Sequence, residues 1–235
     1  MLARVAGAIY LVITGCALFA YLYVRGALIV PDDMAQTVAN LLAHERLLRM
    51  GFSAAVIVVM CNLPLGLLLY ELLKVVNPRV ALLALLFIVA SSTLEAVNAT
   101  HYIEPLLLLR LPEYAAFGPA QVQALVRGPI RLFGPGFGLS LAYFGVFCIL
   151  TGYLLWKSRF FPRLLGVLMI VAGAYYLTNY SFLGFLDLPP VPYIDKLRPT
   201  LVAEVAMALW LLIVGVDETK WRAQVLARES GRPVA

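Results

Sequence analysis

Two carboxylates stand inside long apolar stretches of this 235-residue sequence, where few polar groups are available to meet them. Glu95 lies in the apolar stretch 80–101, and Glu204 lies in the stretch 199–216. An ionised side chain in the middle of a bilayer costs about 2.5–3.5 kcal/mol on insertion scales, so such a residue needs a partner. We therefore expect both carboxylates to face the interior of a helix bundle.

Several basic side chains could serve as partners for these two carboxylates. Arg46, Arg49, His101 and Arg198 all map to the membrane face that is nearest to the acids. A nearby cation or donor recovers much of the cost of moving a carboxylate out of water. We expect at least one of the two acids to approach Arg46, Arg49 or His101.

Glu95 belongs to a row of polar side chains. Ser91, Glu95, Asn98 and Tyr102 stand at i, i+4, i+7 and i+11, so they share one face of a helix, with His101 at its edge. Such a face indicates either a hydrogen-bond network between helices or a ligand site. The sequence leaves both interpretations open for Glu95, and equally for Glu204.

A second polar group precedes the second apolar stretch. Glu45 and Arg49 have the i, i+4 spacing of an ion pair along one helix, which would leave Arg46 able to meet an acid or an anionic ligand. Asn179 stands one turn beyond Tyr175, near the end of the fifth stretch. The candidates for a ligand pocket all map to one half of the membrane: Glu45, Arg46, Arg49, Glu95, Asn98, His101, Asn179 and Glu204.

The elements that would position these residues are transmembrane helices. The chain is 63% hydrophobic and only 13% charged, with a mean hydropathy of +0.91, whereas about a quarter of a soluble domain is charged. A span needs about 20 apolar residues. The predicted fold is an all-α, polytopic transmembrane bundle of about six spans, near residues 5–24, 50–75, 80–101, 137–156, 164–182 and 199–216.

The basic residues indicate orientation. The short loops Lys74–Arg79 and Lys157–Arg163 are basic, and short cytoplasmic loops carry the positive-inside bias. This predicts a protein of the inner (cytoplasmic) membrane with both termini, including a polar tail at 217–235, in the cytoplasm. The net charge of +5 is small, and the basic residues stand between the apolar runs rather than in one basic patch. The lipid bilayer is therefore the expected partner, and nucleic acid is not.

The connections on the outer side should contain short amphipathic segments. Asp32 and Asp33 can cap a helix that carries the apolar stripe of Val38 and Leu41, either on the membrane surface or stacked on the second span. Residues 103–132 form another outer segment, with a short helix expected at Pro119–Arg127.

Proline and glycine predict breaks and close contacts. Pro64 should kink the second span, where Asn62 can bond to the freed backbone or to another helix. The glycine-rich run 134–138 contains Pro135 and should break the chain before the fourth span. Gly134 and Gly138 also have the small-xxx-small spacing that allows close approach between helices.

Three isolated cysteines, Cys16, Cys61 and Cys148, have neither metal-site nor disulfide spacing, so we expect them to pack as small hydrophobes. The run Ile13–Cys16 is similar to a lipoprotein cleavage box. However, the chain stays apolar as far as Val24, so we expect the first span to be retained.

A resemblance to a known family is carried by several runs of the chain: Arg4–Leu11, Ala43–Gly51, Gly152–Leu154 followed by Pro162–Val167, and Glu204–Trp210. Together they resemble the bacterial multi-pass membrane family catalogued as domain of unknown function 4386, over nearly the whole chain. The resemblance implies a multi-pass bacterial membrane protein. It implies no activity and carries over no catalytic residue.

Three functions compete. The favoured hypothesis is a non-enzymatic protein that binds, senses or moves a small or lipophilic molecule through an outward-facing polar pocket. The alternatives are an intramembrane metal-dependent hydrolase acting on lipid, with Glu95, His101 and Glu204 as ligands, and a structural or assembly partner of another membrane protein. The chain has only two histidines and no HExxH motif, so we predict no metal, no cofactor and no identified catalytic residue.

Overall fold

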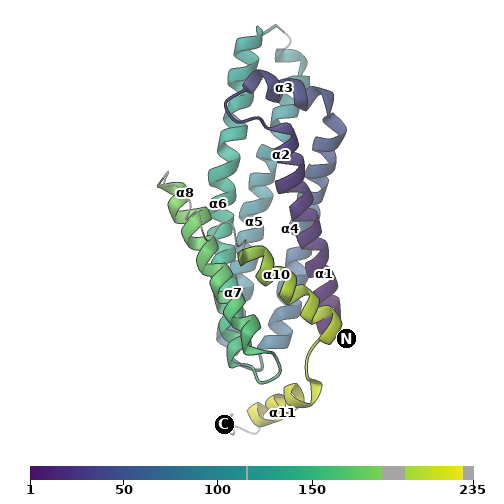
Figure 1. Cartoon of the computed structure of the whole chain (residues 1–235), viewed down its shortest axis with the longest axis vertical. Coiled ribbons are helices and arrows are strands. Elements are labelled where there is room, and N and C mark those ends of the chain that lie inside the picture. Colours follow the sequence, from purple (N-terminus) through teal and green to yellow (C-terminus); the bar gives the residue numbers. More distant parts are fainter. Residues whose placement is uncertain (115, 187–198, 230–235) are drawn as a thin grey trace.

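The computed structural model describes residues 1–114, 116–186 and 199–229, and its long helices lie side by side along one axis (Figure 1). Five helical segments are long and apolar enough to cross a membrane, and a sixth qualifies if a bent pair counts as one span. The described residues contain no strand. The expected all-α, multi-pass transmembrane architecture is therefore confirmed.

The first long segment is a continuous run of α1 (Leu2–Ala17), the π-helical η1 (Leu18–Val24) and α2 (Arg25–Leu28). Then follow α3 (Met34–Ala43), α4 (Glu45–Leu73), α5 (Pro78–Arg110), the short 3₁₀ turn η2 (Pro112–Tyr114) and α6 (Pro119–Lys157). The next run joins α7 (Arg163–Tyr175), the π-helical η3 (Tyr176–Phe182) and α8 (Leu183–Phe185). The last described elements are α10 (Pro199–Leu209), the π-helical η4 (Trp210–Val214) and α11 (Glu218–Glu229).

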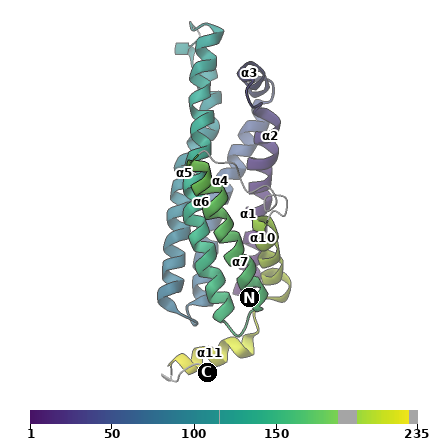
Figure 2. The ribbon, with the colours of Figure 1, turned by 60° about the vertical axis from the view of Figure 1, so that its left-hand side comes forward.

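Two of the helices are much longer than a bilayer requires. With 33 and 39 residues, α5 and α6 extend for about 50 and 58 Å, against about 30 Å of hydrocarbon. Most of the segment 103–132 therefore continues these two helices, and the helix expected at Pro119–Arg127 is only the first part of α6. Both helices project past their neighbours at one end of the molecule (Figure 2).

The expected break at residues 134–138 is wrong, because α6 runs without interruption through Pro129 and Pro135. A proline removes one backbone hydrogen bond, but neighbouring helices and local adjustments let transmembrane helices tolerate it. Pro64 likewise lies inside the continuous helix α4.

Helices α6 and α7 approach each other through glycine. A Cβ atom added to Gly145 would lie 2.8 Å from the carbonyl oxygen of Gly173, and one added to Gly152 would lie 2.6 Å from that of Gly166. Backbone therefore meets backbone at both positions. Gly138 continues the seven-residue spacing and faces the carbonyl of Tyr180 at 2.8 Å. Close approach between helices is therefore observed at Gly138 but not at Gly134, where nothing lies within 4 Å of an added Cβ.

Helix α3 lies across the ends of α2 and α4, beside the projecting parts of α5 and α6 (Figures 1 and 2). Its cap is the predicted one, because the Asp33 carboxylate accepts a hydrogen bond of 2.8 Å from the backbone N–H of Gln36. His44 has a non-helical backbone and separates α3 from α4, so α3 does not stack onto the second span. Leu41 is fully buried on its inner side.

The sixth predicted span is short and sharply bent. Helices α10 and η4 together cover Pro199–Val214, about 24 Å at 1.5 Å per residue. Gly215 then adopts a φ of 77°, a conformation that glycine allows, and α11 leaves at 95°. The Asp217 carboxylate at the start of α11 accepts a backbone hydrogen bond from Lys220, which holds the pKa of that carboxyl below its usual value.

Helix α11 crosses beneath the bundle and covers the end of α4 (Figure 1). The Trp221 indole N–H donates a hydrogen bond of 3.1 Å to the carbonyl of Leu72, and the Arg228 guanidinium donates to the carbonyl of Lys74. The last carbonyls of a helix lack partners within that helix, so these contacts satisfy groups that would otherwise need water. The described part of the predicted polar tail is thus a docked helix.

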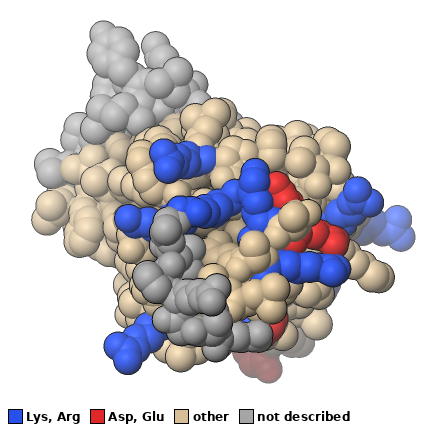
Figure 3. Space-filling view, turned by 90° about the horizontal axis from the view of Figure 1, so that it is seen from below, with Lys and Arg blue, Asp and Glu red and all other residues tan. Residues whose placement is uncertain are grey.

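Basic side chains gather at this same end of the molecule (Figure 3). The end of α4 and the start of α5 bring Lys74 and Arg79 there, and the end of α6 and the start of α7 bring Lys157 and Arg163. The start of α1 adds Arg4. We refer to this as the basic end.

Candidate functional site

A polar level, formed by Glu95, Glu204 and the tyrosines that bond to them, lies beside two of the three clusters of buried apolar residues in the described structure. The cluster nearer the basic end contains Ile88 and Phe147, and the other contains Tyr102 and Phe133. On α5, Glu95 stands between the two clusters, one turn or more from either. Charged and hydroxyl side chains of several helices meet at this level.

The first pair at this level joins η1 to α5. The Tyr21 hydroxyl donates a hydrogen bond of 2.6 Å to Oε1 of Glu95, whose side chain is only 8% exposed. The Tyr21 ring also packs against Phe137, with the centroids 4.6 Å apart. The carboxylate therefore faces the interior, as expected, but its partner is a phenol from the first long segment.

The second pair joins η3 to α10. The Tyr176 hydroxyl donates a hydrogen bond to Oε1 of Glu204. Glu204 also lies within electrostatic range of Tyr10 and Cys148, both of which are buried. Tyr10, whose hydroxyl has no hydrogen-bond partner among the described residues, belongs to the same apolar cluster as Cys148.

The expectation that one of these acids approaches Arg46, Arg49 or His101 is wrong. In the described residues, neither acid forms an ion pair; Arg49 instead pairs with Glu45 at 2.8 Å, and His101 Nδ1 lies 2.8 Å from Glu104. Arg46 is exposed, and Arg198 lies outside the described residues. Phenols replace cations because a tyrosine can reach a buried carboxylate without burying a second charge.

The predicted pairing of Glu45 with Arg49 is confirmed, and Arg110 from the end of α5 joins it at 2.7 Å. This cluster lies at the far end of the molecule from the basic end. The structure therefore does not bring Glu45, Arg46 and Arg49 together with Glu95 and Glu204.

The two candidate asparagines are placed differently. The Asn98 side chain is buried one turn beyond Glu95, presses against Gly136 of α6, and has no hydrogen-bond partner for either amide atom in the described structure. Buried amides of this kind usually hold an ordered water. Asn179 donates a hydrogen bond of 3.2 Å to the Thr178 hydroxyl.

A cavity of about 420 Å³ opens beside the two tyrosine–carboxylate pairs. It lies between η1, α6, η3 and α10, and its volume falls within the range that small-molecule sites occupy. Of the predicted candidates, only Glu204 lines it. The lining residues that the structure describes are Thr14, Ala17, Leu18, Tyr21, Leu22, Phe137, Leu141, Tyr175, Tyr176, Tyr180, Thr200, Leu201 and Glu204.

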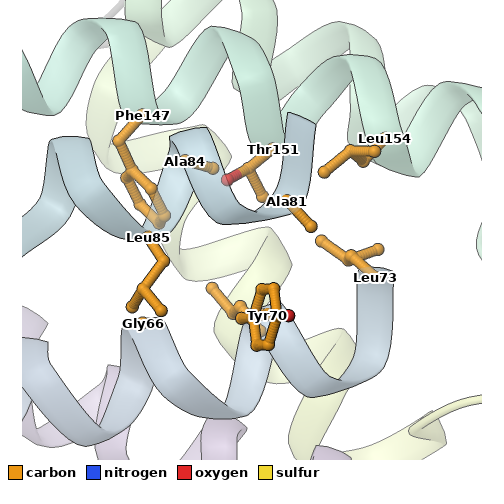
Figure 4. Close-up of a pocket in the computed structure, with 10 residues that line it drawn as sticks. Gly66, Tyr70, Leu73, Ala81, Ala84, Leu85, Phe147, Thr151 and Leu154 are labelled. Atoms are coloured by element: carbon orange, nitrogen blue, oxygen red, sulfur yellow. The ribbon is translucent and has the colours of Figure 1, made fainter. Parts of the chain in front are cut away.

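A second hollow between α4, α5 and α6 is far smaller. Figure 4 shows the Thr151 hydroxyl among apolar side chains that include Ala81, Leu85 and Phe147. The hollow measures about 10 Å³, which is the space of a single water, and the Thr151 hydroxyl has no hydrogen-bond partner in the described structure. This place suits one water molecule and no ligand.

The described residues offer no metal centre. No three His, Cys, Asp or Glu side chains among them gather closely enough to hold an ion. Glu95 and Glu204 bind different tyrosines, and His101 binds Glu104. The geometry therefore gives no support to a hydrolase that uses these three residues as metal ligands.

The sequence interpretation named neither Tyr21 nor Tyr176 as a site residue. One signal could have pointed to Tyr21: Tyr10, Thr14 and Tyr21 stand at i, i+4 and i+11, so hydroxyl groups line one face of the first span. Both tyrosines lie in π-helical turns, which occur frequently at functional sites. A sequence pattern does not reveal such turns.

Comparison with known proteins gives a family. The model of the family described as "Domain of unknown function (DUF4386)" matches residues 5–215, which cover all of the long helices. No curated protein and no solved structure matches the chain. The chain therefore belongs to the DUF4386 family of multi-pass membrane proteins.

Proposed function

We propose that this membrane protein binds a small lipophilic molecule in the cavity between η1, α6, η3 and α10, and senses or moves it. The observation that carries the proposal is a cavity of about 420 Å³ with mostly apolar walls and two convergent tyrosine–carboxylate pairs. Ligand sites commonly combine an apolar pocket with a few placed polar groups, and polar groups within a membrane usually mark function.

The rim of the cavity supports a lipophilic ligand. Leu18, Leu22 and Tyr180 line the cavity, and each of these largely apolar side chains is exposed. In a membrane, the outside of the bundle faces lipid. A molecule dissolved in the bilayer would therefore reach the cavity past apolar side chains without first crossing water.

The basic end supports an orientation. We propose that it faces the cytoplasm, because Lys and Arg of the short connections gather there. The cavity then lies in the outer half of an inner-membrane protein, since its lining residues on the first segment begin at Thr14 and end at Leu22.

A neutral fluorescent probe tests the binding function. N-phenyl-1-naphthylamine brightens in apolar surroundings, and it should bind saturably to the purified protein in lipid nanodiscs. Ala17→Trp adds a large ring to the cavity wall and should remove this binding. Val12→Trp, on an exposed position of the same helix outside the cavity, is the matched control and should leave it unchanged. Equal probe signals from both variants would contradict the proposal.

A further inference from the structure

Three hydroxyl groups of the cavity walls already donate their protons to other groups of the protein. A tyrosine hydroxyl has one proton to donate, and both phenols at the polar level have used theirs: Tyr21 donates to Glu95 and Tyr176 donates to Glu204. The Thr14 hydroxyl, which also lines the cavity, donates to the carbonyl of Tyr10 at 3.0 Å. These three groups therefore present only oxygen lone pairs and ring faces to the cavity.

The same region holds two carboxylates and the cation Arg25, whose guanidinium lies 3.8 Å from the Phe133 ring and near Tyr21 but forms no ion pair with either acid. Glu204 lines the cavity, and Glu95 lies directly behind Tyr21. No Lys, Arg or His of the described residues forms an ion pair with either acid; the ion pairs that the structure shows all lie elsewhere. A carboxylate in low-dielectric surroundings is costly unless a positive charge neutralises it.

Aromatic rings supply a further attraction for positive charge. Tyr21, Phe137, Tyr175, Tyr176 and Tyr180 all line the cavity. The face of an aromatic ring attracts a cation, and the attraction is stronger when water is excluded. A group of rings around a carboxylate is the chemistry by which proteins hold alkylated ammonium groups.

We propose that the ligand is a lipophilic organic cation, an amine or quaternary ammonium compound with an apolar body, whose charge is held by Glu204 and the aromatic walls. This inference rests on the binding function proposed above and adds the class of ligand. Ca²⁺ does not fit, because it takes six to eight oxygen ligands and the described lining supplies one carboxylate and a few hydroxyl groups.

A pair of molecules with the same shape isolates the charge. Benzyltrimethylammonium and neopentylbenzene differ only in having a charged nitrogen or a neutral carbon at the branch point. Each would be titrated against bound N-phenyl-1-naphthylamine in nanodiscs, and the ratio of their displacement constants would be compared between variants. Because both variants share one membrane, the partitioning of the two molecules into lipid cancels.

The charge-removing variant is Glu204→Gln, which keeps the size of the side chain. It should reduce the preference for the cation by about tenfold or more, the size of a desolvated cation–π or ion-pair contribution. Glu204→Asp, which keeps the charge, should retain most of the preference. Glu71→Gln removes a carboxylate that pairs with Lys74 at the basic end, and it should change nothing.

A second variant decides the question without touching the carboxylate. Thr200→Lys would place a tethered ammonium on the cavity wall one turn before Glu204, and it should abolish displacement by benzyltrimethylammonium. Thr200→Met adds similar length without charge and should preserve displacement. Equal displacement in these two variants would overturn the proposal.

The outcomes separate this inference from the function on which it rests. If N-phenyl-1-naphthylamine binds saturably and Ala17→Trp removes it, but the preference for the cation is absent or survives Glu204→Gln, the cavity binds neutral molecules and the cation inference fails. Absence of saturable binding in the wild-type protein would overturn both. A preference lost in Glu204→Gln and kept in Glu71→Gln would support the cation.

Discussion

Tyr21 donates a hydrogen bond of 2.6 Å to Glu95, and this contact ties the first long segment to α5 across 74 positions of the chain. A buried acceptor that loses its donor retains the cost of having left water, which amounts to about 1–3 kcal/mol, and more for a charged group. The bond therefore positions the wall of the cavity and stabilises the fold.

Removing the Tyr21 hydroxyl should lower the stability of the protein. We expect Tyr21→Phe to reduce the free energy of unfolding by about 1–3 kcal/mol, measured by chemical or thermal unfolding in detergent. Tyr23→Phe is the control, because the Tyr23 side chain is 60% exposed two positions further on. In the double variant Tyr21→Phe/Glu95→Leu no unpaired carboxylate remains, so stability should partly return. Identical unfolding of Tyr21→Phe and Tyr23→Phe would show that the bond does not matter.

A methyl group between α6 and α7 should be poorly tolerated. In Gly152→Ala the new Cβ would meet the carbonyl oxygen of Gly166 at 2.6 Å, so the helices must separate, at a cost of about 1–3 kcal/mol. Gly134→Ala adds the same methyl group to the same helix where nothing lies within 4 Å, and it should be neutral or stabilising. Thermal unfolding of the two variants compares them directly. A Gly134→Ala variant less stable than Gly152→Ala would contradict the observed packing.

The docking of α11 should depend on its tryptophan. Trp221→Phe removes the indole donor that bonds to the carbonyl of Leu72, a loss of about 0.5–1.5 kcal/mol. We expect faster amide exchange and faster protease cleavage near Gly215 and in α11, with little change in the rest of the bundle. Trp156→Phe, at an exposed position, should show neither effect. Unchanged exchange of α11 in Trp221→Phe would mean that other contacts hold the helix.

Cysteine labelling tests the proposed orientation. In a background without Cys16, Cys61 and Cys148, the exposed positions Ala35, near the start of α3, and Arg159, after α6, can be changed to cysteine one at a time. A membrane-impermeant maleimide added to intact spheroplasts should label Ala35→Cys and should label Arg159→Cys only after permeabilisation. The reverse pattern would invert the topology.

The parts of this structure that follow from local rules could be predicted from the sequence. The Glu45–Arg49 pair needs only an i, i+4 spacing, and the Asp33 cap needs only a short acceptor before a helix. Glu95 and Glu204 were identifiable because a carboxylate among apolar residues is rare in any membrane protein. The long apolar runs indicated helices long enough to cross a membrane, because a span needs about 20 apolar residues.

The partners of the two carboxylates could not be predicted in the same way. Tyr176 has the residue type and the depth of an interfacial aromatic, and only the packing of η3 against α10 turns its hydroxyl towards Glu204. The continuity of α6 through Pro135 was also hidden, because proline breaks helices in water while lipid penalises an unpaired backbone so strongly that the helix persists. Both errors concern long-range contacts and surroundings that sequence spacing does not contain.

The glycine contacts also determine which parts of the cavity can move. The backbones of α6 and α7 are in contact where Gly145 meets Gly173 and where Gly152 meets Gly166. These two helices therefore have no room to move closer together, and they form a rigid wall of the cavity. Gly7 holds α1 equally tightly, because a Cβ there would lie 2.4 Å from the backbone nitrogen of Leu212. That contact lies near the basic end of α1, whereas the cavity begins at Thr14 and continues away from it. We therefore expect the cavity to widen by movement of the start of α10, away from the Gly7 contact, while α6 and α7 stay in place.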